Sequence, residues 1–248
     1  MTSSNESLLA EVEQERGQKQ NNNGTVQHLH VAVRVRPLPK DQVHALRVEN
    51  GTTIVVSDDD QRSIGGRGAL SASSAVPRFV FDSAFDAFAS NAAIYESMGR
   101  PAVKDVLLGF NAAIFAYGQT SSGKSHTMMG SASDPGLVPM ICAALFYCTG
   151  KMKTDCPPQI TSSFYEVYNE KVHDLLNPEF LPLSDDDDED ALPERKPLPV
   201  REHRKLGVFV DGLTAKPVAT VDDVGPVLMI RANSFFLCRM PIYKYNVA

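Results

Sequence analysis

A short stretch near the beginning of the chain alternates apolar and polar residues. The three valines of residues 30–36 fall on one face of a predicted strand, and Arg34 and Arg36 fall on the other. Pro37 ends this strand because it has no N–H to donate to a ladder. Two arginines on one face either line a pocket for an anion or face solvent, and the alternation alone favours solvent.

A four-residue apolar repeat predicts an amphipathic helix from Asn91 to Phe110. Pro101 is expected to kink or interrupt this helix, and Gly109 to end it. The apolar run Ala112–Tyr117 follows directly and predicts a buried strand. A second helix is expected to begin at Ser125. The segment therefore has the order helix, strand, loop, helix.

Other segments carry shorter patterns. Strands are predicted at 46–48, 53–56, 160–168 and 208–210. Helical segments are predicted from Pro139 through Cys148 and over 171–176, with Thr220 as the N-cap of a further helix. The four phenylalanines of residues 79–88 are expected to pack in the core.

The two ends of the chain differ from the middle in composition. Residues 1–27 are rich in Ser, Glu, Gln and Asn. This composition predicts a disordered leader, with too few apolar residues for a helix at 7–14 to dock. Residues 225–248 are apolar without a recognisable period, and charged residues interrupt them, so we expect no membrane span. We expect this tail to lie outside the domain that covers 28–224.

The loop between the predicted strand and the second helix fits the phosphate-binding pattern G-x-x-x-x-G-K-[ST]. Its residues are Gly118, Gln119, Thr120, Ser121, Ser122, Gly123, Lys124 and Ser125. Small residues let backbone N–H groups curl around a phosphate, and the following helix presents its positive end to that phosphate. Lys124 can reach the outer phosphates, and Ser125 can offer its hydroxyl to Mg²⁺. A Gly/Ser turn can match by chance, but the flanking strand and helix favour a nucleotide-phosphate site.

Composition narrows the class of protein further. A chain of 248 residues can form one sizeable core, and one α/β domain is the expected arrangement. The net charge of −6 coincides with the acidic run 185–190, so no basic surplus points to a nucleic-acid partner. The 4 cysteines form no C-x-x-C pair and no secreted disulfide pattern. We therefore expect a reduced, intracellular, soluble protein.

Longer stretches carry a more specific signal than the phosphate loop alone. They read VAVRVRPL at 31–38, FDSAFD at 81–86, GFNAAIFAYGQTSSGKSHTMMG at 109–130, GLVPMI at 136–141, FYEVYNEKVHDLLNP at 164–178 and VFVDGLT at 208–214. With these stretches, in this order, the chain resembles the kinesin motor domain over residues 28–224.

The resemblance implies a fold and an activity. The fold is an α/β P-loop NTPase with a mixed, mostly parallel central sheet of eight strands and helices on both faces, incomplete here at its C-terminus. The activity is a microtubule-stimulated ATPase that binds ATP and Mg²⁺. Its partner is the microtubule, built of tubulin, and its location is the cytoplasm and the cytoskeleton.

The resemblance also implies roles for single residues. Gly118 to Ser125 match the phosphate loop of the family, and Ser125 stands where a Ser or Thr contacts Mg²⁺. Arg34, Arg36 and Pro37 match the R-x-R-P that flanks the adenine, which reverses the preference for a solvent-facing strand. His126 matches a position that stacks on the base, and Thr127 one near the α-phosphate.

The family pattern stops before its catalytic motifs. Two motifs, N-x-x-S-S-R-S-H and D-L-A-G-S-E, would sense the γ-phosphate and hold Mg²⁺ through water, and neither occurs in the sequence. Residues 222–225 have D-x-x-G spacing, but they follow a helix start rather than a buried strand. Phosphoryl transfer needs positioned water and charge stabilisation. We therefore expect binding without hydrolysis, and a phosphate-loop strand whose apolar face is partly unpaired.

Three interpretations remain at this point. The chain is the N-terminal part of a kinesin-like ATPase, or a genuine short product that binds nucleotide without hydrolysing it, such as a regulatory decoy. The third, an unrelated P-loop kinase or GTPase, is disfavoured by the order of the motifs over 109–178.

Overall fold

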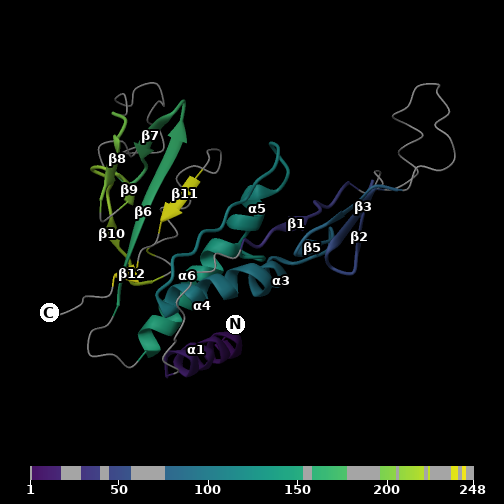
Figure 1. Cartoon of the computed structure of the whole chain (residues 1–248), viewed down its shortest axis with the longest axis horizontal. Helices are drawn as coiled ribbons and strands as arrows, with labels where there is room; N and C mark the ends of the chain where they lie inside the picture. The colour runs from purple at the N-terminus through teal and green to yellow at the C-terminus, as the bar shows by residue number, and fades with distance from the viewer. Residues whose placement is uncertain are drawn as a thin grey trace. The chain divides into compact units, whose positions relative to one another are not determined.

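The structure is a computed structural model, and Figure 1 traces its elements in chain order. It describes residues 2–17, 29–39, 45–56, 76–152, 158–177, 196–204, 207–220, 223, 236–239 and 242–243. The chain divides into two compact units, Met1–Ile141 and Cys142–Ala248, which are treated separately below.

The first unit contains two small sheets. Strand β1 (Ala32–Arg34) pairs in parallel with β5 (Ser83–Phe85). Strands β2 (Leu46–Glu49), β3 (Thr53–Val56) and β4 (Arg78–Val80) form an antiparallel sheet in that order. The predicted strands at 46–48 and 53–56 are confirmed, and the strand predicted over 30–36 is present but shorter.

The prediction that the phenylalanines of 79–88 pack in the core is wrong for two of them. Phe79 and Phe88 are exposed. Phe79 lies on β4, which is an edge strand of its sheet and exposes all three of its residues. Phe88 follows β5, beyond the last paired residue of that ladder. At neither position does a sheet cover the phenylalanine ring.

The helix predicted from Asn91 to Phe110 is present and is interrupted close to its proline. It consists of α3 (Asn91–Ile94), the π-helical turn η1 (Tyr95–Gly99) and α4 (Arg100–Leu108). At the junction the Arg100 N–H donates to the Tyr95 carbonyl, five residues back. Pro101 cannot donate, and its ring crowds the carbonyl four residues before it, so a wider turn fits there. Gly109 ends the helix in the left-handed region, with φ 103°.

A disordered leader over 1–27 is predicted from composition, and this is wrong for its first part. Helix α1 (Thr2–Gly17) lies along α4. The side chains of Leu8 and Val12 are fully buried in this contact, four residues apart on one face of the helix. Residues 18–28 lie outside the described part of the chain.

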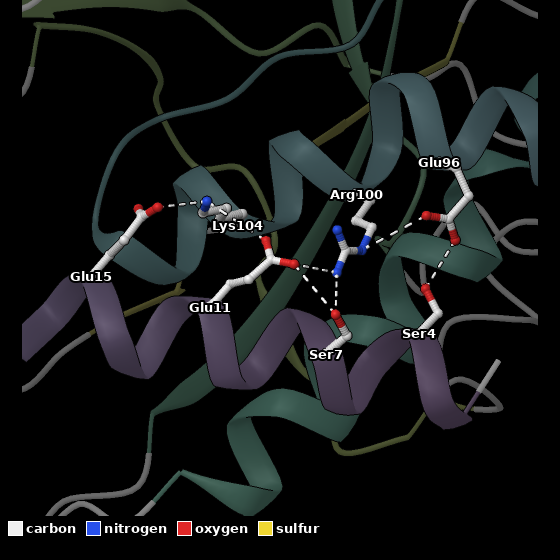
Figure 2. Close-up of polar contacts among 7 residues, drawn as sticks. All are labelled: Ser4, Ser7, Glu11, Glu15, Glu96, Arg100 and Lys104. Carbon is white, nitrogen blue, oxygen red and sulfur yellow. Dashed lines mark hydrogen bonds and ion pairs between the residues drawn. The ribbon is translucent and has the colours of Figure 1, made fainter.

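Ion pairs explain how so polar a helix docks (Figure 2). Glu11 Oε1 lies 2.8 Å from a guanidinium nitrogen of Arg100, and Glu15 Oε1 lies 2.6 Å from Lys104 Nζ. Hydroxyl contacts extend the series, with Ser4 to Glu96 at 2.9 Å and Ser7 to Arg100 at 3.2 Å. Residue numbers rise together along both helices, so the two run parallel. The composition of residues 1–27 does not reveal that their charges match those of α4 in order, so it does not predict the docked helix.

The segment 111–117 departs most from prediction. A buried strand is expected there, but the segment is not a strand and most of it is exposed. Phe115 is 76% and Tyr117 101% exposed. No ladder among the described residues includes this segment, so its backbone has no sheet to join. The expectation of an unpaired apolar face at this position agrees with this arrangement.

A single, mostly parallel sheet of eight strands is not present among the described residues. The ladder between β1 and β5 is parallel, and the other ladders of the described residues are antiparallel. A parallel sheet needs neighbours on both sides of the strand before the phosphate loop. That segment pairs with no described strand, so it cannot connect the small sheets into one.

The second unit is organised around the long strand β6 (Gln159–Tyr168), which confirms the strand predicted at 160–168. Its antiparallel partners are β7 (Lys171–Asp174), β10 (Lys216–Pro217), β11 (Phe236–Arg239) and β12 (Ile242–Tyr243). The tail, in which we find no period, thus supplies two short strands. A separate hairpin joins β8 (Val200–His203) to β9 (Gly207–Val210), which confirms the strand at 208–210.

The helical turn predicted over 171–176 is wrong, because a hairpin occupies its first part. β6 and β7 are joined by Asn169 and Glu170, with φ of 47° and 62°. Two central residues with positive φ make the turn whose twist matches that of paired strands. The sequence signal was weak because Asn favours this conformation and Glu does not.

Helix α6 (Leu137–Lys151) confirms the helix predicted from Pro139 through Cys148. The hydrogen bond expected of a cap at Thr220 is present, since its hydroxyl accepts from the Asp223 N–H at 3.3 Å, while the helix predicted after it lies almost wholly outside the described residues. The Asp223 carboxylate in turn accepts from the Thr220 N–H at 2.8 Å. Within the described residues, no helix combines the length and the apolar character that crossing a membrane requires.

Candidate phosphate-binding site

The phosphate loop is shaped by residues in unusual backbone conformations. Gly118 has φ 157° and Gly123 φ 102°, and between them Ser121 has φ 63°. A Cβ at Gly118 would lie 2.5 Å from Ser122 Oγ, so a larger residue there would displace the loop. Gly123 directly precedes α5 (Lys124–Met128). The second helix predicted from Ser125 is therefore present, one residue earlier, and is short.

The Lys124 side chain folds back onto the phosphate loop. Its Nζ donates to the Gly118 and Gln119 carbonyls, each at 2.8 Å. The ammonium group is thus held at the beginning of the loop, where the backbone turns. Carbonyl oxygens are weaker partners for a cation than phosphate oxygens are. Phosphate oxygens can therefore replace these carbonyls as partners of Lys124.

Arg36 reaches the phosphate loop, and Arg34 reaches α5. Arg36 Nη1 donates to the Ser121 carbonyl. Arg34 Nη1 donates to Thr127 Oγ1 at 2.9 Å and lies 3.5 Å from His126 Nδ1. The preference for a solvent-facing arginine face, drawn from alternation alone, is therefore wrong for Arg34. The ladder with β5 fixes the orientation of β1 and so directs these side chains.

Arg34 is held in a partly buried position. Besides Thr127, it donates to the Ala89 carbonyl at 2.8 Å. Burial lowers the pKa of its guanidinium, and the charge of Asp134 acts in the opposite direction. Arginine nonetheless stays protonated in proteins. A fixed positive charge therefore lies beside His126 and Thr127.

Sequence reasoning missed a residue at the centre of this arrangement. Asn91 is 0% exposed, and its Oδ1 accepts from Arg34 Nη1 at 2.6 Å. Its Nδ2 donates to the His126 carbonyl at 3.2 Å and to the Asp134 carbonyl at 3.1 Å. A signal was present in the sequence, since Asn91 is three residues before Ile94 and so lies on the apolar face of its helix. A polar residue on that face needs buried partners.

The loop after α5 is tightly closed and so fixes the Asp134 carbonyl. The Gly136 N–H donates to the Met129 carbonyl at 3.0 Å, and the Ser131 N–H donates to the Asp134 carbonyl at 2.9 Å. A Cβ at Gly136 would lie 2.5 Å from the backbone of Met128. The loop therefore has little room to move away from Asn91.

The groups gathered here fit a polyphosphate with a divalent cation. Lys124 and Arg36 supply positive charges at the loop, and Arg34 supplies a third on the helix that follows it. Ser125 exposes its side chain in the first turn of α5. Mg²⁺ is commonly bound by one or two protein oxygens together with substrate phosphates and water. A serine hydroxyl beside the loop satisfies that requirement.

Comparison with known proteins gives a consistent result. The family model described as "Kinesin motor domain" matches residues 34–234. Human "Kinesin-like protein KIF14" is 34% identical over 202 residues, which cover 78% of this chain and 11% of that protein. Human "Kinesin-like protein KIF13B" is 34% identical over 208 residues, covering 78% of this chain and 10% of that protein.

Solved structures agree with these relatives. A KIF14 dimer with AMP-PNP, in complex with a microtubule, superposes with a TM-score of 0.65 at 32% identity. The match covers 82% of this chain and 53% of the KIF14 chain, so this chain spans about half of that solved motor. KIF14 with ADP, also on a microtubule, gives the same TM-score and identity. The likeness confirms the predicted α/β P-loop NTPase fold class.

Proposed function

The chain belongs to the kinesin motor domain family, and from this we propose that its loop Gly118–Ser125 binds the phosphates of ATP with Mg²⁺. We propose further that the complete motor domain uses ATP hydrolysis to move along microtubules. Cytoplasmic microtubules would then be both its partner and its location.

The observation that supports the nucleotide site most directly is the convergence of two cations on one loop, with a third, Arg34, on the helix that follows it. Lys124 contacts the carbonyls of Gly118 and Gln119, and Arg36 contacts that of Ser121. Such a concentration of positive charge beside backbone N–H groups is suited to a polyphosphate.

Each side chain has a proposed role. Lys124 would bind the outer phosphates, and Ser125 would offer its hydroxyl to Mg²⁺. Thr127 would lie near the α-phosphate. Arg34, Arg36 and Pro37 would flank the adenine, with His126 stacked on the base. When bound, Mg²⁺ would neutralise part of the phosphate charge.

We expect hydrolysis of ATP to require two motifs that this sequence does not contain. Neither N-x-x-S-S-R-S-H nor D-L-A-G-S-E occurs in its 248 residues. Transfer of a phosphoryl group depends on a positioned water and on charge stabilisation, which those motifs would supply. We therefore propose that this chain holds nucleotide without turning it over. A chain that holds nucleotide without hydrolysing it would serve as a regulatory decoy, the second candidate function.

The binding proposal is tested with Lys124→Ala. Titration calorimetry with Mg·ATP should show saturable binding to the wild-type chain and none to the variant, because the loop loses its lysine. Lys196→Ala is the matched control, since Lys196 is exposed and lies in the second unit. Equal binding by the wild type and Lys124→Ala would reject the site.

The proposal on turnover needs a separate assay. Phosphate release from ATP should stay at background for this chain, with or without microtubules. Stimulation by microtubules would show that the chain contains catalytic groups outside the family motifs.

A further inference from the structure

The Asn91 side chain makes hydrogen bonds to three segments of the first unit. The amide oxygen accepts from Arg34 on β1. The amide nitrogen donates to the carbonyls of His126 on α5 and of Asp134 in the following loop. Asn91 is 0% exposed. An amide is the side chain that accepts and donates in one plane, so few substitutes satisfy all three contacts.

Starting a helix does not require these contacts. The cap of α3 is Ser90, whose hydroxyl accepts from the Ala93 N–H at 3.3 Å. Asn91 is the next residue and makes its contacts away from its own helix. A buried amide that joins three segments costs free energy unless every contact is made. The arrangement therefore fixes those segments relative to one another.

Two of the residues that Asn91 joins have proposed roles at the nucleotide base. Arg34 would flank the adenine, and His126 would stack on it. Lys124, which would hold the phosphates, donates to the Gly118 and Gln119 carbonyls, whereas one amide links Arg34 directly to the His126 backbone. One group of residues would therefore position the base, and a different group would bind the phosphates.

We propose that Asn91 is a positioning residue that holds Arg34 and His126 in the arrangement that recognises the adenine base. This inference rests on the proposed function, since it assumes that these two residues meet the base. It predicts that Asn91 contributes to the affinity for ATP and not to the affinity for the triphosphate group alone.

The test compares Mg·ATP with Mg·tripolyphosphate, which has the phosphates and no base. Asn91→Ala should lower the affinity for Mg·ATP roughly tenfold or more, since a partly buried guanidinium loses a partner. Its affinity for Mg·tripolyphosphate should stay within about twofold of the wild type. Ser90→Ala is the matched control, because it weakens the start of the same helix and leaves Arg34 untouched. It should bind both ligands as the wild type does.

A second variant and a wild-type measurement cover the case in which Asn91→Ala does not fold. Asn91→Asp keeps the acceptor for Arg34 and loses the donor to the His126 carbonyl, so it should show the same split between the two ligands. In the wild type, the side-chain N–H resonances of Arg34 and Asn91 should shift with Mg·ATP and not with Mg·tripolyphosphate.

The outcomes separate this inference from the proposed function. If the wild type binds neither ligand, the proposed function fails. If the wild type binds both, and the Asn91 variants lose both equally or neither, the positioning role is overturned. The same holds if the two N–H resonances do not respond to Mg·ATP.

Discussion

Glu15 Oε1 lies 2.6 Å from Lys104 Nζ and so links the first helix of the chain to the helix that leads into the phosphate loop. Both side chains are partly exposed, which limits the strength of the pair. We expect Glu15→Lys to lower the free energy of unfolding by up to about 1 kcal/mol, because it places like charges together. Denaturant unfolding measures this change.

Glu13→Lys is the control for that pair, since Glu13 is exposed on the same helix. It carries the same change of charge without a partner on α4 among the described contacts. An equal loss of stability in both variants would contradict a specific role for the ion pair.

Leu8 should carry much of the docking free energy of α1, because it is fully buried on a mostly polar helix. Leu8→Ala removes that contact and leaves a cavity, which costs about 2 to 4 kcal/mol at buried sites. Hydrogen exchange at residues 100–108 should become faster when α1 detaches. Leu9→Ala, at a half-exposed neighbour, should change exchange little. Unchanged exchange in Leu8→Ala would contradict the docking.

Docking of α1 should weaken in acid. A hydrogen bond from Arg100, with the charges of Arg100 and Lys104, lowers the pKa of Glu11 from its usual 4.5. A carboxyl whose pKa is lower in the folded state stabilises that state above its usual pKa, and this is lost as pH falls through the folded pKa. Unfolding measured from about pH 6 to pH 3 should show this loss. Glu11→Gln should reduce the pH dependence and Glu13→Gln should not; equal slopes in the two variants would count against the assignment.

The turn between β6 and β7 offers a stabilising change. Glu170 has φ 62°, a conformation that costs free energy for any residue with a Cβ. Glu170→Gly should raise the free energy of unfolding by roughly 0.5 to 1 kcal/mol. Glu166→Gly, within the paired part of β6, should lower it. A destabilising Glu170→Gly, seen by thermal unfolding, would mean that the hairpin is not formed.

Sequence patterns predicted those features that are determined by residues close together in the chain. The break near Pro101 and the loop at Gly118 follow from backbone rules, and the structure has both. Contacts between distant segments were not predictable in the same way. Leu8 is buried where α1 docks on α4, a contact that ion pairs accompany, and Phe115 is exposed because its segment has no sheet neighbour among the described strands.

In the candidate site, too, local features could be predicted and contacts between distant segments could not. The phosphate loop could be read from its spacing, because the residues that shape it are adjacent in sequence. Alternation predicts a solvent-facing Arg34, and this is wrong because alternation carries no information on the segment that lies opposite; the adenine role implied by the resemblance stays a prediction. Asn91 required the structure, since its partners come from three separate segments.

The most direct test of the central claim is a titration of the isotopically labelled chain with Mg·ATP, followed by NMR. We predict saturable shifts centred on the backbone amides of 118–127 and on the His126 ring, with smaller shifts at Arg34. Lys124→Ala should abolish them. Shifts confined to other parts of the chain, or none at saturating Mg·ATP, would contradict the nucleotide site.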